Sequence, residues 1–248
     1  MTHGDPLAMT VAATHRSIEE RLGEVLSPHT DPHRPRDGQA AADAFLAATS
    51  RHLAAVEEVL VDEVRRLVPD PERLATDYLE AARDLEQVLS LVKARLYGEA
   101  HAAALAWPEI WARVRERLER HNALELELVG ALGRHGDADH VDTLARAVFE
   151  AETHAPTRPH PLLPHRGPLG RVARRVFAIA DRFWDTAEGR VIPEPVRPPR
   201  RTHDSLLAQY LVADPKFDDH ASVLEHKHAK RGSRSRGLPP TGTTGPGH

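Results

Sequence analysis

Apolar residues recur every three or four positions along most of the first 135 residues, which is the spacing of amphipathic α-helices. Pro69 interrupts the pattern, and Gly133 and Gly136 close it. The helical segments that we expect are 9–25, 39–67, 72–98 and 107–134. No stretch alternates apolar and polar residues for long enough to indicate a strand. Four helices of this length, joined by short or moderate loops, predict an all-α fold built as an up-down-up-down four-helix bundle.

A shorter helical segment follows over residues 139–152, and another helical segment over residues 168–189, and a connector rich in proline and histidine separates them. Both segments have apolar faces that we expect to pack on the bundle. In the second segment this face holds Val172, Val176, Ile179, Phe183 and Trp184. After Pro193, prolines and polar residues predict disorder. The expected organisation is a bundle over 9–135, a helical extension over 136–192 and a mostly disordered tail over 193–248.

The composition narrows the class of protein. None of the 248 residues is cysteine, which excludes disulfides, thiolate metal ligands and thiol catalysis, and fits a reducing compartment. The chain shows no export signal and no apolar run of membrane-spanning length, so we expect a cytoplasmic protein without a membrane partner. The basic residues between 227 and 236 have no interleaved aromatics, so we expect no specific nucleic-acid partner. The absence of phosphate-binding glycine loops and of common hydrolase motifs favours a binding protein over an enzyme.

Titratable residues stand in line with the apolar residues that should form the core. His15, His52 and His121 lie in three of the four helical seams, and Glu125 lies one turn after His121. Residues four apart differ by only about 40° around a helix, so His121 and Glu125 point to the same interior region. Buried charges and unpaired imidazoles are costly. Either these residues bind something inside the protein, or they satisfy one another as hydrogen-bonded pairs.

Imidazoles and a carboxylate that converge from different helices are the groups with which a helical bundle holds a metal ion. Because the chain has no cysteine, this donor set suits iron, zinc, copper or manganese. The residues alone leave both a metal site and a metal-free set of hydrogen-bonded pairs open.

The order of these motifs resembles the hemerythrin-like family of histidine–histidine–glutamate cation-binding domains. There a four-helix bundle holds two irons through a histidine, a His-x-x-x-Glu, a second histidine and a second His-x-x-x-Glu on successive helices. His15 in AATHRSIEERL is similar to the first-helix histidine, and His52 in SRHLAAVEEVL to the second-helix one. His121 and Glu125 in RHNALE resemble the fourth-helix motif in full. The resemblance covers residues 10–190, because PTRPHPLLPHRG and the following helix are similar to an extension on many members.

The chain departs from this family pattern at two positions. Val56 stands where the second-helix glutamate is expected, and Leu85 occupies the third-helix seam, which has no histidine nearby. Glu57 and Glu86 are the nearest substitute donors, although a regular helix turns each of them away from its seam. The family's ligand set is therefore incomplete in this sequence.

The resemblance implies a protein that binds non-haem iron, as one or two ions, and that binds or senses dioxygen, iron or redox state. The candidate ligands are His15, His52, His121, Glu125, Glu57 and Glu86. The implied partners are the metal ion and dioxygen. The alternative is a degenerate bundle that has lost its metal and acts as a scaffold or interaction module. A protein partner or a homodimer fits either function.

Overall fold

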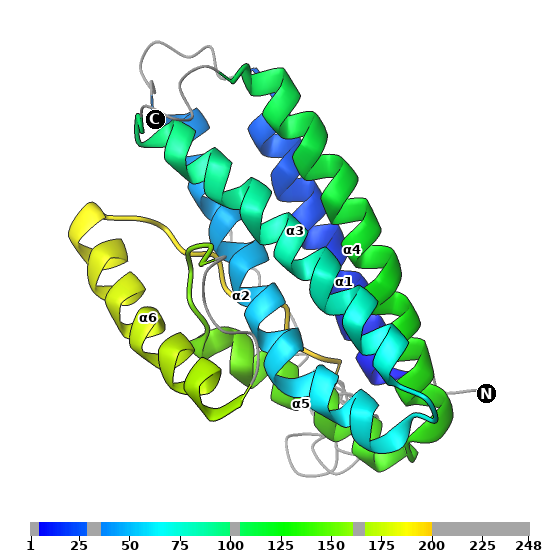
Figure 1. Cartoon of the computed structure of the whole chain (residues 1–248). Helices are drawn as coiled ribbons and strands as arrows, with labels where there is room; N and C mark the ends of the chain where they lie inside the picture. The colour runs from blue at the N-terminus through cyan, green and yellow to red at the C-terminus, as the bar shows by residue number, and fades with distance from the viewer. Residues whose placement is uncertain (1–4, 29–35, 100–104, 161–166, 200–248) are drawn as a thin grey trace, which may run out of the picture. The chain divides into compact units, whose positions relative to one another are not determined.

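The computed structural model of the chain describes residues 5–28, 36–99, 105–160 and 167–199. All of them belong to the first of two units into which the chain divides after Pro199. Across these ranges the chain forms helices and no strand, which confirms the all-α prediction (Figure 1). The helices are α1 (Pro6–Leu26), α2 (Asp37–Leu67), α3 (Glu72–Leu96), α4 (Trp107–His135), α5 (Ala138–His154) and α6 (Gly167–Glu188).

The helix boundaries follow capping and breaking residues, and only the start of α1 differs clearly from the prediction. α1 begins at Pro6 because Asp5 caps it, with Oδ1 accepting from the backbone N–H groups of Leu7 at 2.9 Å and Ala8 at 3.2 Å. Proline at the first helical position lacks only an N–H that would have had no partner within the helix. The periodic apolar pattern therefore underestimates the length of α1.

An Asp5→Ala variant is expected to lower the free energy of unfolding by about 1 kcal/mol, because two N–H groups at the start of α1 lose their acceptor. Urea unfolding followed by circular dichroism measures this difference. Glu20→Ala, an exposed change on the same helix, is the control and should stay within about 0.5 kcal/mol. Equal effects of the two changes would show that the cap contributes nothing.

One apolar core is shared by α1 to α5. α1 packs against α2, α4 and α5. In addition, α2 contacts α3, α4 and α5. The helix α3 lies along α4 (Figure 1). The predicted seams face this core, and Val11, Phe45 and Leu132 are each fully buried. Val56 and Leu85, the two departures from the family pattern, are also 0% exposed and lie within the apolar cluster. Both positions are therefore ordinary packing positions of the core.

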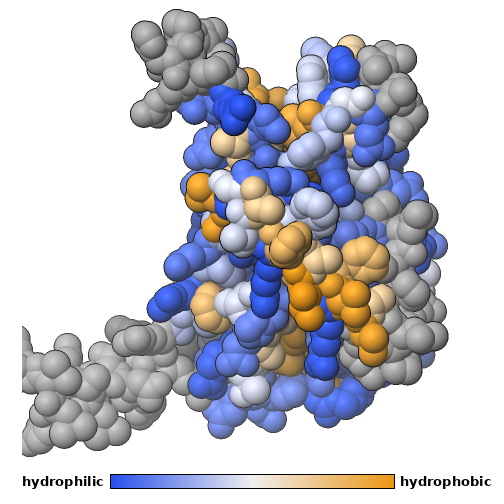
Figure 2. Space-filling model, turned by 90° about the vertical axis from the view of Figure 1, so that its left-hand side faces the viewer, coloured by the Kyte–Doolittle hydropathy of each residue, from blue (hydrophilic) through white to orange (hydrophobic). Residues whose placement is uncertain are grey.

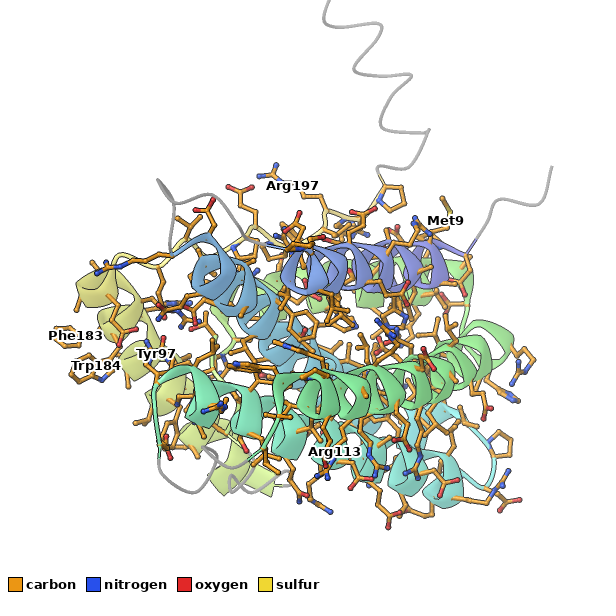
Figure 3. All side chains as sticks on the ribbon, turned by 90° about the horizontal axis from the view of Figure 1, so that it is seen from above. Met9, Tyr97, Arg113, Phe183, Trp184 and Arg197 are labelled. Carbon is orange, nitrogen blue, oxygen red and sulfur yellow. The ribbon has the colours of Figure 1, made fainter. Side chains whose placement is uncertain are left out.

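The two helices of the C-terminal extension behave differently. α5 buries Val141, Leu144 and Val148 in the core, which confirms its prediction. The prediction for α6 is wrong, because its apolar face points away from the other helices. This face holds Val172, Val176, Ile179, Phe183 and Trp184, each at least half exposed. Figure 2 shows apolar residues gathered on the side of the molecule that carries α6, and Figure 3 shows Phe183 and Trp184 pointing outward.

Polar contacts explain this orientation of α6. Its buried positions include Ala178, Asp181 and Asp185. Asp181 accepts from the backbone N–H of Thr157 at 3.0 Å, and Asp185 accepts from the Thr157 hydroxyl. A carboxylate that receives several hydrogen bonds is held more firmly than an apolar side chain that only touches a surface. The carboxylate face, rather than the apolar face, therefore sets how α6 lies.

Residues 155–160 in the predicted connector and 190–199 after α6 have no regular secondary structure. The rest of the connector, 161–166, and the tail from residue 200 lie outside the described residues. The disorder of the tail and the three-part division of the chain therefore stay predictions. None of the described helices is both long enough and apolar enough to cross a membrane.

Candidate metal centre

Three buried side chains from three helices meet inside the core. They are His15 on α1, His52 on α2 and Glu125 on α4, with exposed fractions of 5%, 2% and 0%. The Nε2 atom of each histidine lies 3.1 Å from Oε2 of Glu125. One ligand atom from each of the three residues lies within 4.8 Å of the other two. The structure thus brings together three of the six residues that the sequence analysis proposed as ligands.

Helical periodicity forces these groups inward. His15 lies four residues after Val11 and three before Ile18, and both of these neighbours are buried on α1. His52 lies in the same way four residues before the buried Val56 on α2. Because α1 contacts both α2 and α4, and α2 also contacts α4, the buried stripes of the three helices converge. Packing of the leucines and valines therefore places the donors.

The donor types and their spacing fit one metal ion. Ligand atoms bonded to the same ion at about 2.1 Å lie about 3 to 4 Å from one another, which is compatible with the observed spacing. Within the described part of the chain, Oε1 of Glu125 accepts no hydrogen bond, although Nε2 of His52 lies 3.0 Å away. A buried carboxylate oxygen without a hydrogen bond is costly unless another group takes it up. A bound ion would give the Glu125 carboxylate a further partner at this position.

A carboxylate on α5 orients His52 from the far side of the ring. Nδ1–H of His52 donates to Oε1 of Glu152 at 2.7 Å, and both side chains are buried. A fixed hydrogen bond at Nδ1 presents Nε2 to the centre, as carboxylates commonly do for metal-binding histidines. The sequence analysis missed Glu152. Its signal was a position four residues after the buried Val148, where a core-facing carboxylate requires a partner.

His121 lies beside the three converging groups rather than among them. Its Nδ1 is 3.7 Å from Oε2 of Glu125, and its Nε2 is 3.3 Å from the hydroxyl of Tyr78 on α3. Tyr78 is fully buried, with its ring centre 5.2 Å from that of His121. The sequence analysis missed this residue too, although a buried phenol in the α3 seam requires a hydrogen-bond partner. His121 as a ligand stays a prediction.

His52 and Glu125 stabilise each other's charged forms, and each shifts the pKa of the other. Burial alone would lower the pKa of His52, but the charge of Glu125 and hydrogen bonds to Glu125 and Glu152 raise it to about 10. Burial would likewise raise the pKa of Glu125, but the charge of His52 and hydrogen bonds from both histidines hold it well below its ordinary value. In the metal-free protein at neutral pH, His52 is therefore an imidazolium and Glu125 a carboxylate, so binding of a metal ion by His52 requires Nε2 to release its proton.

Burial has the largest effect on the pKa values of the two neighbouring groups, His121 and Tyr78. It lowers the pKa of His121 to about 4 despite the attraction of Glu125, so this imidazole is neutral at neutral pH. Burial raises the pKa of Tyr78 well above its ordinary value, and the charge of Glu125 raises it further. Glu57 and Glu86 act on the pKa of Tyr78 in the same direction. His121 and Tyr78 thus form a neutral polar pair next to the charged one.

Glu57 and Glu86, the substitute donors suggested by the sequence, are not among the three converging groups. Glu57 on α2 is 7% exposed, and Glu86 on α3 is half-buried. Both lie close enough to Tyr78 to raise its pKa, so they belong to the same region of the core. Their ligand atoms are not part of the group around Glu125. A ligand role for either glutamate stays a prediction.

Comparison with known proteins assigns no family. No family model, no curated protein and no solved structure matches the sequence.

Proposed function

We propose that this chain is a metal-binding protein that holds one ferrous ion through His15, His52 and Glu125. The observation that carries the proposal is the convergence of two imidazole nitrogens and one carboxylate, each from a different helix, inside the core. Burying three such groups is costly, and among the described residues Oε1 of Glu125 accepts no hydrogen bond, although it lies 3.0 Å from Nε2 of His52. Binding an ion would use every donor that the helices bring together.

Iron is the ion that this donor set favours. Two histidines and one carboxylate with open coordination positions are typical of non-haem ferrous centres, and the hemerythrin-like resemblance implies the same metal. When bound, ferrous iron would supply one-electron redox chemistry and open positions for a small ligand such as dioxygen. The chain's own residues do the rest. Glu152 orients His52, and the apolar cluster around the centre excludes bulk water.

The resemblance also supplies the finer description of the fold. In this proposal α1 to α4 form an up-down-up-down four-helix bundle, and α5 and α6 form its C-terminal extension. Contacts of α1 with α2 and α4, and of α3 with the same two helices, support this arrangement. The function that fits such a protein is cytoplasmic binding or sensing of dioxygen, iron or redox state.

A metal-free scaffold is the second candidate, and two observations favour it. Val56 and Leu85 are core residues at positions where the family pattern has metal ligands. His52 also has a carboxylate partner at each ring nitrogen, Glu125 at Nε2 and Glu152 at Nδ1. If the protein is a metal-free scaffold, the pairing of His52 with its carboxylates stabilises the fold, and the protein functions by binding partners at its surface.

Anaerobic titration of the full chain with ferrous iron separates the two candidates. The metal-binding function predicts one saturable equivalent per chain and a change in the optical spectrum when air is admitted. Parallel titrations with zinc and manganese show whether the site prefers iron. A folded protein that binds none of these ions would reject the metal proposal and favour the scaffold.

A Glu152→Ala variant is expected to bind ferrous iron about 10- to 100-fold more weakly, because His52 loses the group that orients its ring. Glu152→Gln keeps a hydrogen-bond acceptor and should recover most of the affinity. Glu150→Ala, an exposed change on the same helix, is the matched control. Equal iron affinities in all three variants would show that Glu152 does not position the ligand.

A further inference from the structure

The outward face of α6 exposes large apolar side chains in one continuous patch, which we call the α6 patch (Figure 2). It consists of Val172, Val176, Phe177, Ile179, Phe183 and Trp184, with exposed fractions between 38% and 68%. Figure 3 shows Phe183 and Trp184 pointing away from the helices of the core. A contiguous exposed apolar patch of this kind often marks an interaction site.

Buried polar contacts prevent α6 from turning this patch toward the core. Asp181 accepts from the backbone N–H groups of Thr157 and Arg158, each at 3.0 Å. Asp185 accepts from Nη1 of Arg190 at 2.6 Å. Rolling the helix over would break these contacts and bury charges against apolar side chains. The outward direction of the patch is therefore built into the fold.

The spacing within the α6 patch indicates what covers it. Val172, Val176, Ile179 and Phe183 follow one another at intervals of four, three and four residues, which is the seam of two paired helices. The described helices α1 to α5 already bury their apolar faces in the core. A second copy of the chain offers a helix with the same seam. We propose that the α6 patch is a homodimer surface, on which α6 of a second copy packs in parallel.

The residues beside the seam favour the parallel alignment. Arg175 and Arg182 lie along one margin of the seam, and Ala173 and Ala180 lie along the other. In a parallel pair each arginine margin faces the alanine margin of the partner helix. In an antiparallel pair the arginines of the two copies would face each other and repel. The small alanines also let the two helices approach closely.

The area of the α6 patch suffices for a weak dimer. At roughly 150 to 250 Å² for each free side chain, the exposed fractions of the four seam residues leave roughly 400 Å² per copy, while Phe177 and Trp184 lie roughly 120° around the helix from the seam. The seams of two copies would together bury roughly 800 Å², which is the size of weak and transient interfaces. We therefore expect a dissociation constant in the micromolar range. This inference does not depend on whether the chain binds a metal.

Sedimentation velocity of the full chain, over a range of micromolar concentrations, tests the proposal. The wild-type protein is expected to show a concentration-dependent dimer. Ile179→Glu should raise the dissociation constant at least about 100-fold, because each copy then buries an unpaired carboxylate in the seam. Leu126→Glu, at an exposed apolar position on α4, is the matched control and should leave the dimer intact. Unchanged circular dichroism would confirm that each variant is folded.

An introduced cysteine locates the contact, because the chain has none of its own. In a parallel pair of α6 helices, residue 176 of one copy faces residue 176 of the other. The Val176→Cys variant is therefore expected to form a covalent dimer on mild oxidation. Leu126→Cys should form no covalent dimer under the same conditions. Cross-linking of Leu126→Cys but not of Val176→Cys would place the interface elsewhere and overturn the proposal.

Two further results would overturn the homodimer. One is a wild-type protein that stays monomeric throughout the concentration range. The other is a monomer that co-sediments with vesicles of anionic phospholipid and loses this binding in the Ile179→Glu variant. That result would identify the α6 patch as a lipid-binding surface instead.

Discussion

A Glu125→Gln variant is expected to bind ferrous iron at least about 100-fold more weakly than the wild-type protein. Glu125 is the one anionic group among the three that converge, and Nε2 of both histidines lies 3.1 Å from its Oε2. The amide has nearly the same shape, but it carries no charge and replaces one donor oxygen with an NH₂ group that repels a cation. Anaerobic titration with ferrous iron measures the difference.

The same change should lower the free energy of unfolding of the metal-free protein by about 2 to 3 kcal/mol, because it removes one of the two carboxylates that pair with the buried imidazolium of His52 and leaves only Glu152. Glu127→Gln, at an exposed position on the same helix, is the control and should change neither iron affinity nor stability. If Glu125→Gln behaved like this control in both measurements, the carboxylate would neither bind a metal nor pair with His52.

A Leu85→Ala variant is expected to lower the free energy of unfolding by about 3 kcal/mol while leaving the number of iron ions per chain unchanged. Leu85 is fully buried on α3 within the apolar cluster, at the seam position where the family pattern expects a ligand. Truncation leaves a cavity and removes apolar contacts, but it removes no donor. Urea unfolding and metal analysis of the same preparation give both quantities.

Leu126→Ala provides the matched comparison for Leu85→Ala. Leu126 on α4 is 47% exposed, so its truncation should cost well under half as much. A small effect at Leu85 would contradict its assignment to the core. A change in iron stoichiometry would instead mean that α3 shapes the metal centre directly.

Most of the fold could be predicted because the apolar spacing is regular and the breakers are clear. Pro69 separates α2 from α3, and Gly136 follows the last residue of α4, as expected from the sequence. The start of α1 could not be placed from periodicity, since the Asp5 cap extends the helix beyond its first apolar repeat. Local capping chemistry, rather than hydrophobic pattern, sets that boundary.

The candidate site could be predicted only in part, because periodicity shows which residues face inward but not which of them touch. His15, His52 and Glu125 do converge. His121 shares their orientation, yet its Nε2 lies against Tyr78, since the levels of α3 and α4 within the core bring these two rings together. The contact of Glu152 with His52 joins α5 to α2 across 100 residues of sequence, which no local pattern reveals.

The orientation of α6 shows where apolar pattern misleads. Val172, Val176 and Ile179 follow the same spacing of three and four residues that correctly predicts the buried faces of α1 to α5. On α6 the hydrogen bonds of Asp181 and Asp185 decide the orientation, and the apolar stripe faces outward. An amphipathic pattern predicts that the apolar face of a helix is buried, but it does not show whether the residues that bury it belong to the same chain.

The central claim is that the histidine–carboxylate group holds a metal, and elemental analysis tests it most directly. The full chain, purified without an affinity tag and reconstituted anaerobically with ferrous iron, would be compared with Glu125→Gln after removal of unbound metal. We predict one iron per chain in the wild-type protein and none in the variant. A folded wild-type protein without bound metal, or a variant that retains the same iron content, would contradict the claim.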